Sequence, residues 1–241
     1  MSDPPLLLEA RGVTMRFGGV TAVDSVDFAL REVELRCLIG PNGAGKSTFF
    51  KTLTGQLRPT EGEIRLRGKT ITGANSHAIA RLGVGIKTQV PNVFNGLSVR
   101  ENVFVAAGRG KSAAAARRVV DQTLARLCLE PIAARIVGQL AHGDRQWVEI
   151  ATVLAQEPDL ILLDEPAAGM THEEVLRTAE LIREINQAHA LIVVEHDMQF
   201  VRMIASTVTV FHQGRILIED AVDVVLADQR VRDVYLGKAA A

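Results

Sequence analysis

The chain alternates apolar and polar residues over 6–17 and 20–30, a period of two that indicates strands with one buried face. Gly18-Gly19 separates the two segments, so we expect an antiparallel pair. Continuous apolar runs at 160–163 and 191–194 are too short for helices. They predict strands buried on both faces of a parallel sheet, and residues 34–39 predict another buried strand.

Helical spacing fills much of the remaining chain. Ser98 and Glu101 form a capping-box pattern ahead of a helix over 99–107. The predicted face of the helix over 173–187 comprises Val175, Leu176, Ala179, Ile182 and Ile185. The other predicted helices are 48–53, 76–82, 112–128 and a tail over 221–236, and the shorter strands are 63–66, 69–71, 84–88, 207–211 and 215–218.

This order predicts an α/β fold in a single domain over 1–241. Strands and helices alternate in 1–89 and 157–220, which we expect to form the core with a mainly parallel sheet. Residues 90–156 are mostly helical and predict an inserted helical subdomain. We expect residues 221–241 to form a C-terminal helical tail.

Composition limits the function. The net charge is −1 with no long basic run, so nucleic acid is not the expected partner. Cys37 and Cys128 stand apart in apolar surroundings and are expected to be buried thiols. No apolar run approaches the roughly 20 residues that span a bilayer. We therefore expect a soluble cytoplasmic chain whose membrane role, if any, comes through partners.

The segment Gly40-Pro41-Asn42-Gly43-Ala44-Gly45-Lys46-Ser47 lies between a predicted strand and a predicted helix. Glycines allow successive backbone N–H groups to converge on phosphate oxygens, and the helix N-terminus adds positive charge. Lys46 can reach terminal phosphates and the Ser47 hydroxyl can bind Mg²⁺. A glycine-rich turn with a stray lysine is the alternative, which the match of both glycines, the lysine and the serine in this context argues against.

Acidic residues and a histidine end the neighbouring strands. Asp164 and Glu165 follow residues 160–163, at the sheet edge where α/β proteins bind ligands. Asp164 can hold Mg²⁺ and Glu165 can orient an attacking water. His196 follows 191–194 and can contact a terminal phosphate, with Asp197 as the cap of the next helix. The alternatives are a surface acid pair and a histidine without function.

Five features together resemble the ATP-binding subunits of ABC transporters: residues 40–48, Gln89, 140–144, 160–166 and His196. The resemblance implies an ABC ATPase, a P-loop NTPase fold with an antiparallel N-terminal part, that hydrolyses ATP with Mg²⁺. It gives catalytic roles to Lys46, Gln89, Glu165 and His196, and metal binding to Ser47, Gln89 and Asp164. The implied nucleotide-binding residues are Phe17, which would stack on adenine, with Gly40, Pro41, Asn42, Gly43, Ala44, Gly45, Lys46, Ser47, Thr48, Gln89 and Asp164.

The resemblance also implies partners. A second ATPase subunit, the same or a different chain, would pair head to tail and place Ala141, His142, Gly143 and Asp144 on the partner's ATP. Residues 167–171 would cross that interface. Permease subunits would bind the helical subdomain near Val93, Phe94 and Asn95, and a substrate-binding protein would act indirectly. The location is then peripheral, on the inner face of the cell membrane.

Two departures from the family pattern stand out. The usual signature Leu-Ser-Gly-Gly-Gln is Leu140-Ala141-His142-Gly143-Asp144, which lacks a hydroxyl and adds an acid. Val33 stands where the family usually has glycine. We expect ATP bound at the altered signature to be hydrolysed more slowly.

Residues 16–20, 93–102 and 234–237 look like the importers of branched-chain amino acids. Residues 142–147, 168–171 and 195–198 look most like the ATP-binding subunit of urea importers, so urea is the expected solute. The alternatives are a branched-chain or other amino acid, a soluble ABC ATPase of repair or translation, and a subunit that binds ATP without hydrolysis.

Overall fold

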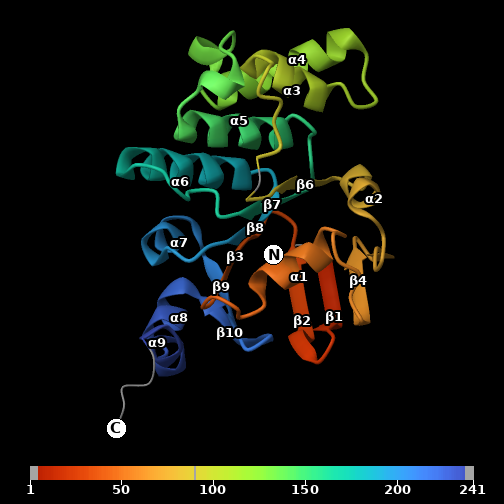
Figure 1. Ribbon diagram of the computed structural model, residues 1–241, viewed down its shortest axis with the longest axis vertical. Coiled ribbons are helices and arrows are strands. Elements are labelled where there is room, and N and C mark those ends of the chain that lie inside the picture. The colour runs from red at the N-terminus through yellow and green to blue at the C-terminus, as the bar shows by residue number, and fades with distance from the viewer. Residues whose placement is uncertain (1–4, 90, 237–241) are drawn as a thin grey trace.

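The computed structural model describes residues 5–89 and 91–236, which form two sheets and the helices around them (Figure 1). Val90, the first residue of the predicted helical subdomain, lies outside the described residues, as do 1–4 and 237–241. The P-loop α/β architecture predicted from the sequence is confirmed, with an antiparallel N-terminal sheet and a mainly parallel central one.

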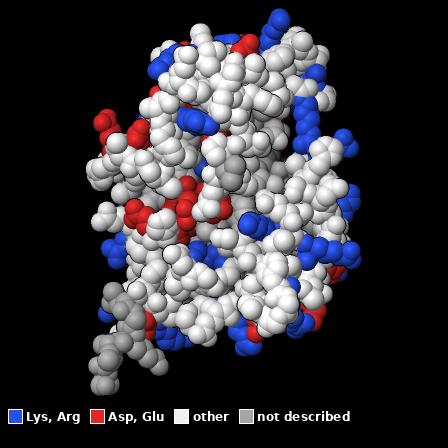
Figure 2. All heavy atoms as spheres, in the orientation of Figure 1, with Lys and Arg blue, Asp and Glu red and all other residues white. Residues whose placement is uncertain are grey.

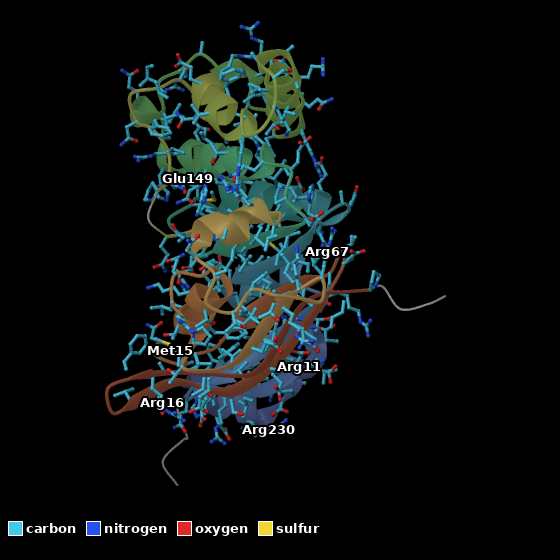
Figure 3. The ribbon with its side chains drawn as sticks, turned by 90° about the vertical axis from the view of Figure 1, so that its right-hand side faces the viewer. Arg11, Met15, Arg16, Arg67, Glu149 and Arg230 are labelled. Carbon is cyan, nitrogen blue, oxygen red and sulfur yellow. The ribbon has the colours of Figure 1, made fainter. Side chains whose placement is uncertain are left out.

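The N-terminal sheet has the order β2-β1-β4-β5 and is antiparallel throughout. Its main pair is the predicted one, with Phe17 opposite Val20 across the Gly18-Gly19 turn. Figure 3 shows Arg16 near the tip of this hairpin. The four strands are β1 (Leu6–Phe17), β2 (Val20–Arg31), β4 (Glu61–Leu66) and β5 (Lys69–Thr70).

The central sheet has the order β10-β9-β3-β8-β7-β6, in which β10 alone pairs antiparallel with its neighbour. Because the other strands are parallel and in register, their carboxyl ends share one edge, where Asp164 pairs with Val194 and Val194 with Leu38. The strands are β3 (Leu35–Ile39), β6 (Val84–Lys87), β7 (Leu160–Asp164), β8 (Ala190–Val194), β9 (Thr207–His212) and β10 (Arg215–Ala221).

Burial on both faces explains the continuous apolar runs. Along β7, Ile161 and Leu163 enter one hydrophobic core, and Leu160 and Leu162 enter another on the opposite face. The first core lies against the helices shown at the upper left of Figure 1, and the second lies between the two sheets, around Phe49 of α1. Alternate residues of one strand therefore hold the two layers together.

Helix ends follow the predicted caps. Ser98 and Glu101 form the capping box that precedes α3, and the Asp197 side chain accepts N–H bonds at the start of α7. The helices are α1 (Lys46–Leu53), α2 (Ser76–Arg81), α3 (Val99–Ala107), α4 (Ala113–Arg126), α5 (His142–Leu154), α6 (His172–Asn186), α7 (Met198–Ile204), α8 (Val222–Ala227) and α9 (Gln229–Leu236), with 3-10 turns at Glu130–Ile132 and Val137–Gln139.

A buried ion pair joins the helical part to the sheet. Lys87 at the end of β6 places Nζ 3.8 Å from the Glu149 carboxylate of α5, and both side chains are almost fully buried. Glu149 lies where α5 meets the rest of the molecule (Figure 3). Burial lowers the pKa of Lys87 and raises that of Glu149. Helices α3, α4 and α5 pack on one another beyond this pair (Figure 1), and the boundary at 90–156 stays a prediction.

Three expectations were wrong in detail. Leu176 is exposed, because α6 turns Thr178 and Leu181 toward the core in its place. Cys128 is exposed at the turn after α4, whereas Cys37 is buried as expected. The C-terminal tail is two helices and not one, because Asp228 breaks the helix and accepts the Arg230 N–H that begins the second.

Candidate functional site

The phosphate loop depends on glycine at two close approaches. Gly40 has φ +145° and Gly45 has φ +105°, both in a region that disfavours side chains. A Cβ on Gly40 would lie 2.3 Å from the Phe211 carbonyl oxygen, and one on Gly45 would lie 2.5 Å from that of Ala22. The loop is thus pressed against β9 and β2, and it ends where α1 begins at Lys46.

Lys46 is held inside this loop. Its Nζ donates hydrogen bonds to the carbonyl oxygens of Gly40, at 2.6 Å, and Pro41, at 3.0 Å. Burial lowers the pKa of Lys46, while Glu165 and Asp164 act in the opposite direction and favour the charged form. The ammonium is therefore fixed beside the loop backbone, where it can meet a phosphate.

The carboxyl edge of the sheet brings the predicted acids and histidine together. Glu165 Oε1 lies 3.2 Å from Nδ1 of His196, each residue following its own strand. The backbone N–H of Glu165 donates to the Val194 carbonyl oxygen at 3.0 Å, which ties the two strand ends. Glu165 also has φ +47°, a conformation that costs a non-glycine residue about 1–2 kcal/mol. Such strain is commonly retained where a side chain must be aimed at a ligand.

Asp164 carries the structural sign of a metal ligand. Its side chain is buried, and its Oδ1 has no hydrogen-bond partner within the part of the chain that the structure describes. Burial raises the pKa of Asp164, and the neighbouring Glu165 raises it further. An unpartnered buried carboxylate oxygen is costly unless a cation satisfies it, so the donor set fits Mg²⁺, which uses one or two protein ligands and phosphate oxygens.

One cavity of about 390 Å³ is lined by the phosphate loop, by Glu165 and by two further predicted residues, Phe17 and Gln89. Phe17 and Gln89 are both exposed on its wall. Figure 2 shows acidic side chains gathered near the middle of this face of the molecule, with basic ones close by. The complete lining is Phe17, Ala22, Asn42, Gly43, Ala44, Gly45, Lys46, Ser47, Thr48, Gln89, Glu165 and Val194. The shape and charges suit a nucleoside polyphosphate, and Phe17 offers a face for a base.

The four signature residues form a separate group at the start of α5. Ala141 is the N-cap and His142 the first helical residue. His142 faces the loop that follows Glu165, and Gly143 abuts Glu174 of α6. These residues do not line the cavity above.

Two residues of the site escaped the sequence analysis. Ala22 lines the cavity and its carbonyl abuts Gly45, a role that no side-chain pattern encodes. Glu195 is buried, and its carboxylate accepts the N–H groups of His196, at 3.1 Å, and Ala167, at 3.5 Å. Its signal was an acid directly after a buried strand, the same pattern that pointed to Asp164.

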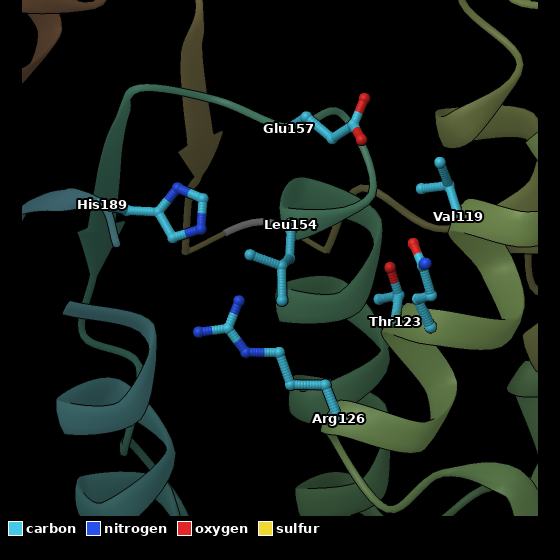
Figure 4. A pocket seen from close by; sticks show the side chains of 7 residues that line it. Val119, Thr123, Arg126, Leu154, Glu157 and His189 are labelled. Atoms are coloured by element: carbon cyan, nitrogen blue, oxygen red, sulfur yellow. The ribbon is translucent and has the colours of Figure 1, made fainter. Parts of the chain in front are cut away.

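A second, smaller cavity of about 160 Å³ lies beside α4 and α5 (Figure 4). Arg126 and Glu157 on its wall are already paired, with Glu184 and Lys111 respectively. His189 bonds the Pro158 carbonyl oxygen through Nδ1, at 2.7 Å. With its charges satisfied, this cavity is a poor candidate for the nucleotide.

Comparison with known proteins agrees with this geometry. Residues 23–168 match the family described as "ABC transporter". The chain is 38% identical to the "High-affinity branched-chain amino acid transport ATP-binding protein LivG" of Salmonella typhimurium, over 99% of this chain and all of that one. It is 35% identical to BraF of Pseudomonas aeruginosa, a protein of the same description, with the same coverage.

Other relatives differ in named solute. A Burkholderia lata protein named for ribose and galactose import is 37% identical over 88% of this chain and 43% of its own length. Among solved structures, a nucleotide-free ATP-binding cassette of an ABC transporter has a TM-score of 0.87 at 25% identity, covering 97% of this chain and 100% of the other. A cassette in its ADP conformation has a TM-score of 0.87 at 26% identity, with the same coverage.

Proposed function

Because the chain belongs to the ABC transporter family, as an ATP-binding subunit that hydrolyses ATP, we propose that it powers an importer of branched-chain amino acids. The observation that carries the proposal is the end-to-end match to LivG and BraF, both named for that transport. The Burkholderia relative shows that similar identity also occurs between subunits named for different solutes, so the solute needs a direct test.

Urea is the second candidate, and it rests on residues 142–147, 168–171 and 195–198. In the structure these stretches lie around the loop after Glu165 and beside His196. They belong to the hydrolysis machinery, where they do not meet the solute. Their likeness therefore supports urea through ancestry alone, and the named relatives favour branched-chain amino acids.

We expect ATP to lie along the cavity, with its base on Phe17 and its phosphates in residues 40–48. Lys46 and the α1 N-terminus would balance phosphate charge, and Ser47, Asp164 and Gln89 would hold Mg²⁺, which neutralises charge on the phosphate oxygens. Glu165 would orient the attacking water, in line with the leaving oxygen, and His196 would contact the terminal phosphate. The 3.2 Å contact between Glu165 Oε1 and His196 Nδ1 would hold the carboxylate in place for that task.

A second ATPase subunit would complete the site. The signature residues Ala141, His142, Gly143 and Asp144 stand apart from this chain's own cavity, which supports their action in trans on a partner's nucleotide. The N-terminus of α5 can offer backbone N–H groups there even though Ala141 lacks a hydroxyl. ATP would close the pair and hydrolysis would reopen it.

The permease contact is proposed at Phe94. Its side chain is 59% exposed, which argues against packing in the helical part's own core. The loop backbone is nevertheless fixed, because the buried Asn102 side chain accepts the Phe94 N–H at 2.7 Å and donates to its carbonyl at 3.0 Å. A rigid loop that presents an apolar ring is a suitable docking handle. Val93 packs on the core and Asn95 bonds Arg145, so they support this presentation.

Within the described residues, the helices are too short and too polar to cross a membrane. Because the named relatives are transport ATP-binding proteins, we propose a peripheral location on the inner face of the membrane beside permease subunits, with a substrate-binding protein acting on the permease. Phe94→Asp should abolish transport while ATP binding and folding persist. Phe104→Asp is unsuitable as a control because Phe104 packs on the core, so Val105→Asp, at an exposed position, serves instead.

The test is uptake in a host that lacks this chain. Labelled leucine and labelled urea are supplied in parallel, and the host carries the wild-type chain or Glu165→Gln. Leucine uptake restored by wild type alone supports the proposal. Urea uptake in its place keeps the importer and replaces the solute, and failure of both, with a chain that stays off the membrane, contradicts an importer role.

A further inference from the structure

The first turn of α5 packs against the loop that leaves the catalytic edge. His142 Nε2 lies 3.0 Å from the carbonyl oxygen of Ala168, three residues after Glu165. The family pattern usually has glycine at the position of His142, and glycine has no side chain with which to make this contact.

Donor and acceptor rules define this contact. A carbonyl oxygen can only accept, so His142 Nε2 must carry the hydrogen that points at Ala168. Gln146 places its amide nitrogen 3.3 Å from the same Nε2, where two donors would oppose each other. Exchanging the two similar ends of this amide turns its oxygen, otherwise without a partner in the described chain, toward the imidazole. The Gln146 oxygen then shares the single Nε2 hydrogen with the Ala168 carbonyl oxygen, as the second acceptor of a three-centre bond, and helps to hold the ring.

A second contact interlocks the same two segments. A Cβ on Gly143 would lie 2.0 Å from Glu174 Oε1, so a side chain at position 143 would displace the Glu174 carboxylate from its present position. Glu174 is fixed by its capping box with Thr171, whose N–H and hydroxyl both donate to Oε2. The start of α5 therefore contacts the chain after Glu165 at two points, Ala168 in the loop and Glu174 in the first turn of α6.

Hydrogen bonds connect the Ala168 loop to Glu165 and to its neighbouring strand end. The Ala168 N–H donates to the Glu165 carbonyl oxygen at 3.3 Å, and the Ala167 N–H donates to Glu195 at 3.5 Å. Glu195 in turn accepts the His196 N–H at 3.1 Å. A shift of Ala168 therefore moves the backbone that sets Glu165.

We propose that His142 is a positioning residue for Glu165 of its own chain, acting through Ala168. It does so in addition to any contact with a partner's nucleotide. Since Glu165 has a strained φ of +47°, its side chain needs support on both sides of the residue, and His142 supplies it on the C-terminal side.

The structural test is amide hydrogen exchange over residues 165–171 of the free chain, measured by mass spectrometry. His142→Phe keeps a ring and removes the donor, and His142→Gln keeps a donor of similar reach. His172→Phe is the matched control, because His172 is exposed and is likewise the first residue of its helix. We expect faster exchange in His142→Phe alone. Wild-type exchange in that variant overturns the proposal.

The kinetic test uses the assembled transporter and rests on the proposed function. We expect kcat for ATP to fall about 5-fold in His142→Phe with KM unchanged, since one hydrogen bond that supports Glu165 is lost. His142→Gln should stay within about 2-fold of wild type by the same reasoning. A rise in KM with kcat unchanged would instead assign His142 to nucleotide binding and overturn the positioning role. The exchange result stands even if the solute or the importer role is wrong, so the two failures are distinguishable.

Discussion

Nδ1 of His196 lies 3.2 Å from Oε1 of Glu165, although the two residues follow different strands of the central sheet. The parallel pairing of β7 and β8 brings both strand ends to one edge, and the Glu165 N–H bond to Val194 fixes their spacing. Glu165 then lines the cavity that also contains Lys46 and Ser47. A carboxylate, a cation and a hydroxyl thus converge in one cavity, where we propose that a terminal phosphate is attacked.

Glu165→Gln should remove hydrolysis and keep ATP binding. The amide preserves the shape and the contact with His196 but cannot take a proton from water, and loss of a general base typically slows a reaction by about 100-fold or more. ATP turnover of the assembled complex gives the rate, and fluorescent-nucleotide binding gives the affinity. Closed pairs should accumulate in ATP and appear as dimers on size exclusion.

Glu173→Gln is the matched control for that experiment. Glu173 is an exposed acid in the first turn of α6, away from the cavity lining. Its variant should turn over ATP at the wild-type rate. Wild-type hydrolysis by Glu165→Gln would mean that another group handles the water.

Asp164→Asn should make the free chain more stable at pH 7 while lowering hydrolysis about 100-fold or more. Asp164 is buried, one of its oxygens lacks a partner in the described chain, and burial and Glu165 raise its pKa. A buried charge of this kind costs folding free energy, which an uncharged amide avoids. We propose that stability is given up at this position for metal binding.

The pH dependence of this stabilisation has a definite sign. The folded chain holds the Asp164 proton more tightly than the unfolded chain does, whose pKa is the ordinary 3.8. Wild-type stability therefore falls as pH rises from 3.8 through the raised pKa, and Asn at this position has no such loss. The advantage of Asp164→Asn should shrink toward pH 3.8 in urea denaturation without nucleotide or Mg²⁺. An advantage that grows in acid would contradict this account.

Much of the site could be predicted because its signals are local. Residues 40–47 combine a glycine pattern with a strand before and a helix after, and Asp164 and Glu165 directly follow a buried apolar run. Once the strands are parallel, the position of such residues at the carboxyl edge follows from the topology. Phe17 needed the family resemblance, since an aromatic residue at a hairpin turn has no distinctive pattern of its own.

What could not be predicted depends on contacts between distant segments. The bond from His142 to Ala168 and the role of Glu195 require the packing of α5 and β8 against one loop. Leu176 was misassigned because a helical period places it near the buried face, while the direction of α6 against its neighbours decides which edge is covered.

Val33→Gly should raise the free energy of unfolding by about 0.5–1 kcal/mol. Val33 has φ +57°, where a side chain costs about 1–2 kcal/mol. Glycine removes this strain, but part of the gain is lost because glycine gives the unfolded chain more conformational freedom. Its side chain is half exposed, so little packing is lost. Val20→Gly, an exposed valine within β2, should destabilise in the same denaturation series. A loss of stability in Val33→Gly would show that the valine side chain contributes packing.

Ala141→Ser should stabilise α5 by about 1 kcal/mol. Ala141 already has the extended N-cap backbone, with φ −61° and ψ 162°, but no side-chain oxygen to accept an N–H of the first turn. Ser at this position can accept one, and chemical denaturation of the free chain measures the gain. Ala141→Val is the control, since it changes the same exposed position without adding an acceptor and valine, like alanine, is a poor N-cap.

Ala141→Ser combined with Asp144→Gln should raise ATP turnover of the assembled complex. The new hydroxyl can donate to a partner's terminal phosphate, and removing Asp144 removes a negative charge at the same helix start. A hydrogen bond to a charged group contributes about 1.5–3 kcal/mol, so a rise of about 10-fold is expected if the altered signature limits hydrolysis. The Asp144 carboxylate also stabilises α5, because it lies near the positive N-terminus of the helix. Its removal should cost about 0.3–1 kcal/mol of stability, which offsets the gain from the new cap. The double variant should therefore raise turnover with little change in stability. Unchanged turnover would mean that another step, such as solute release or reopening, sets the rate.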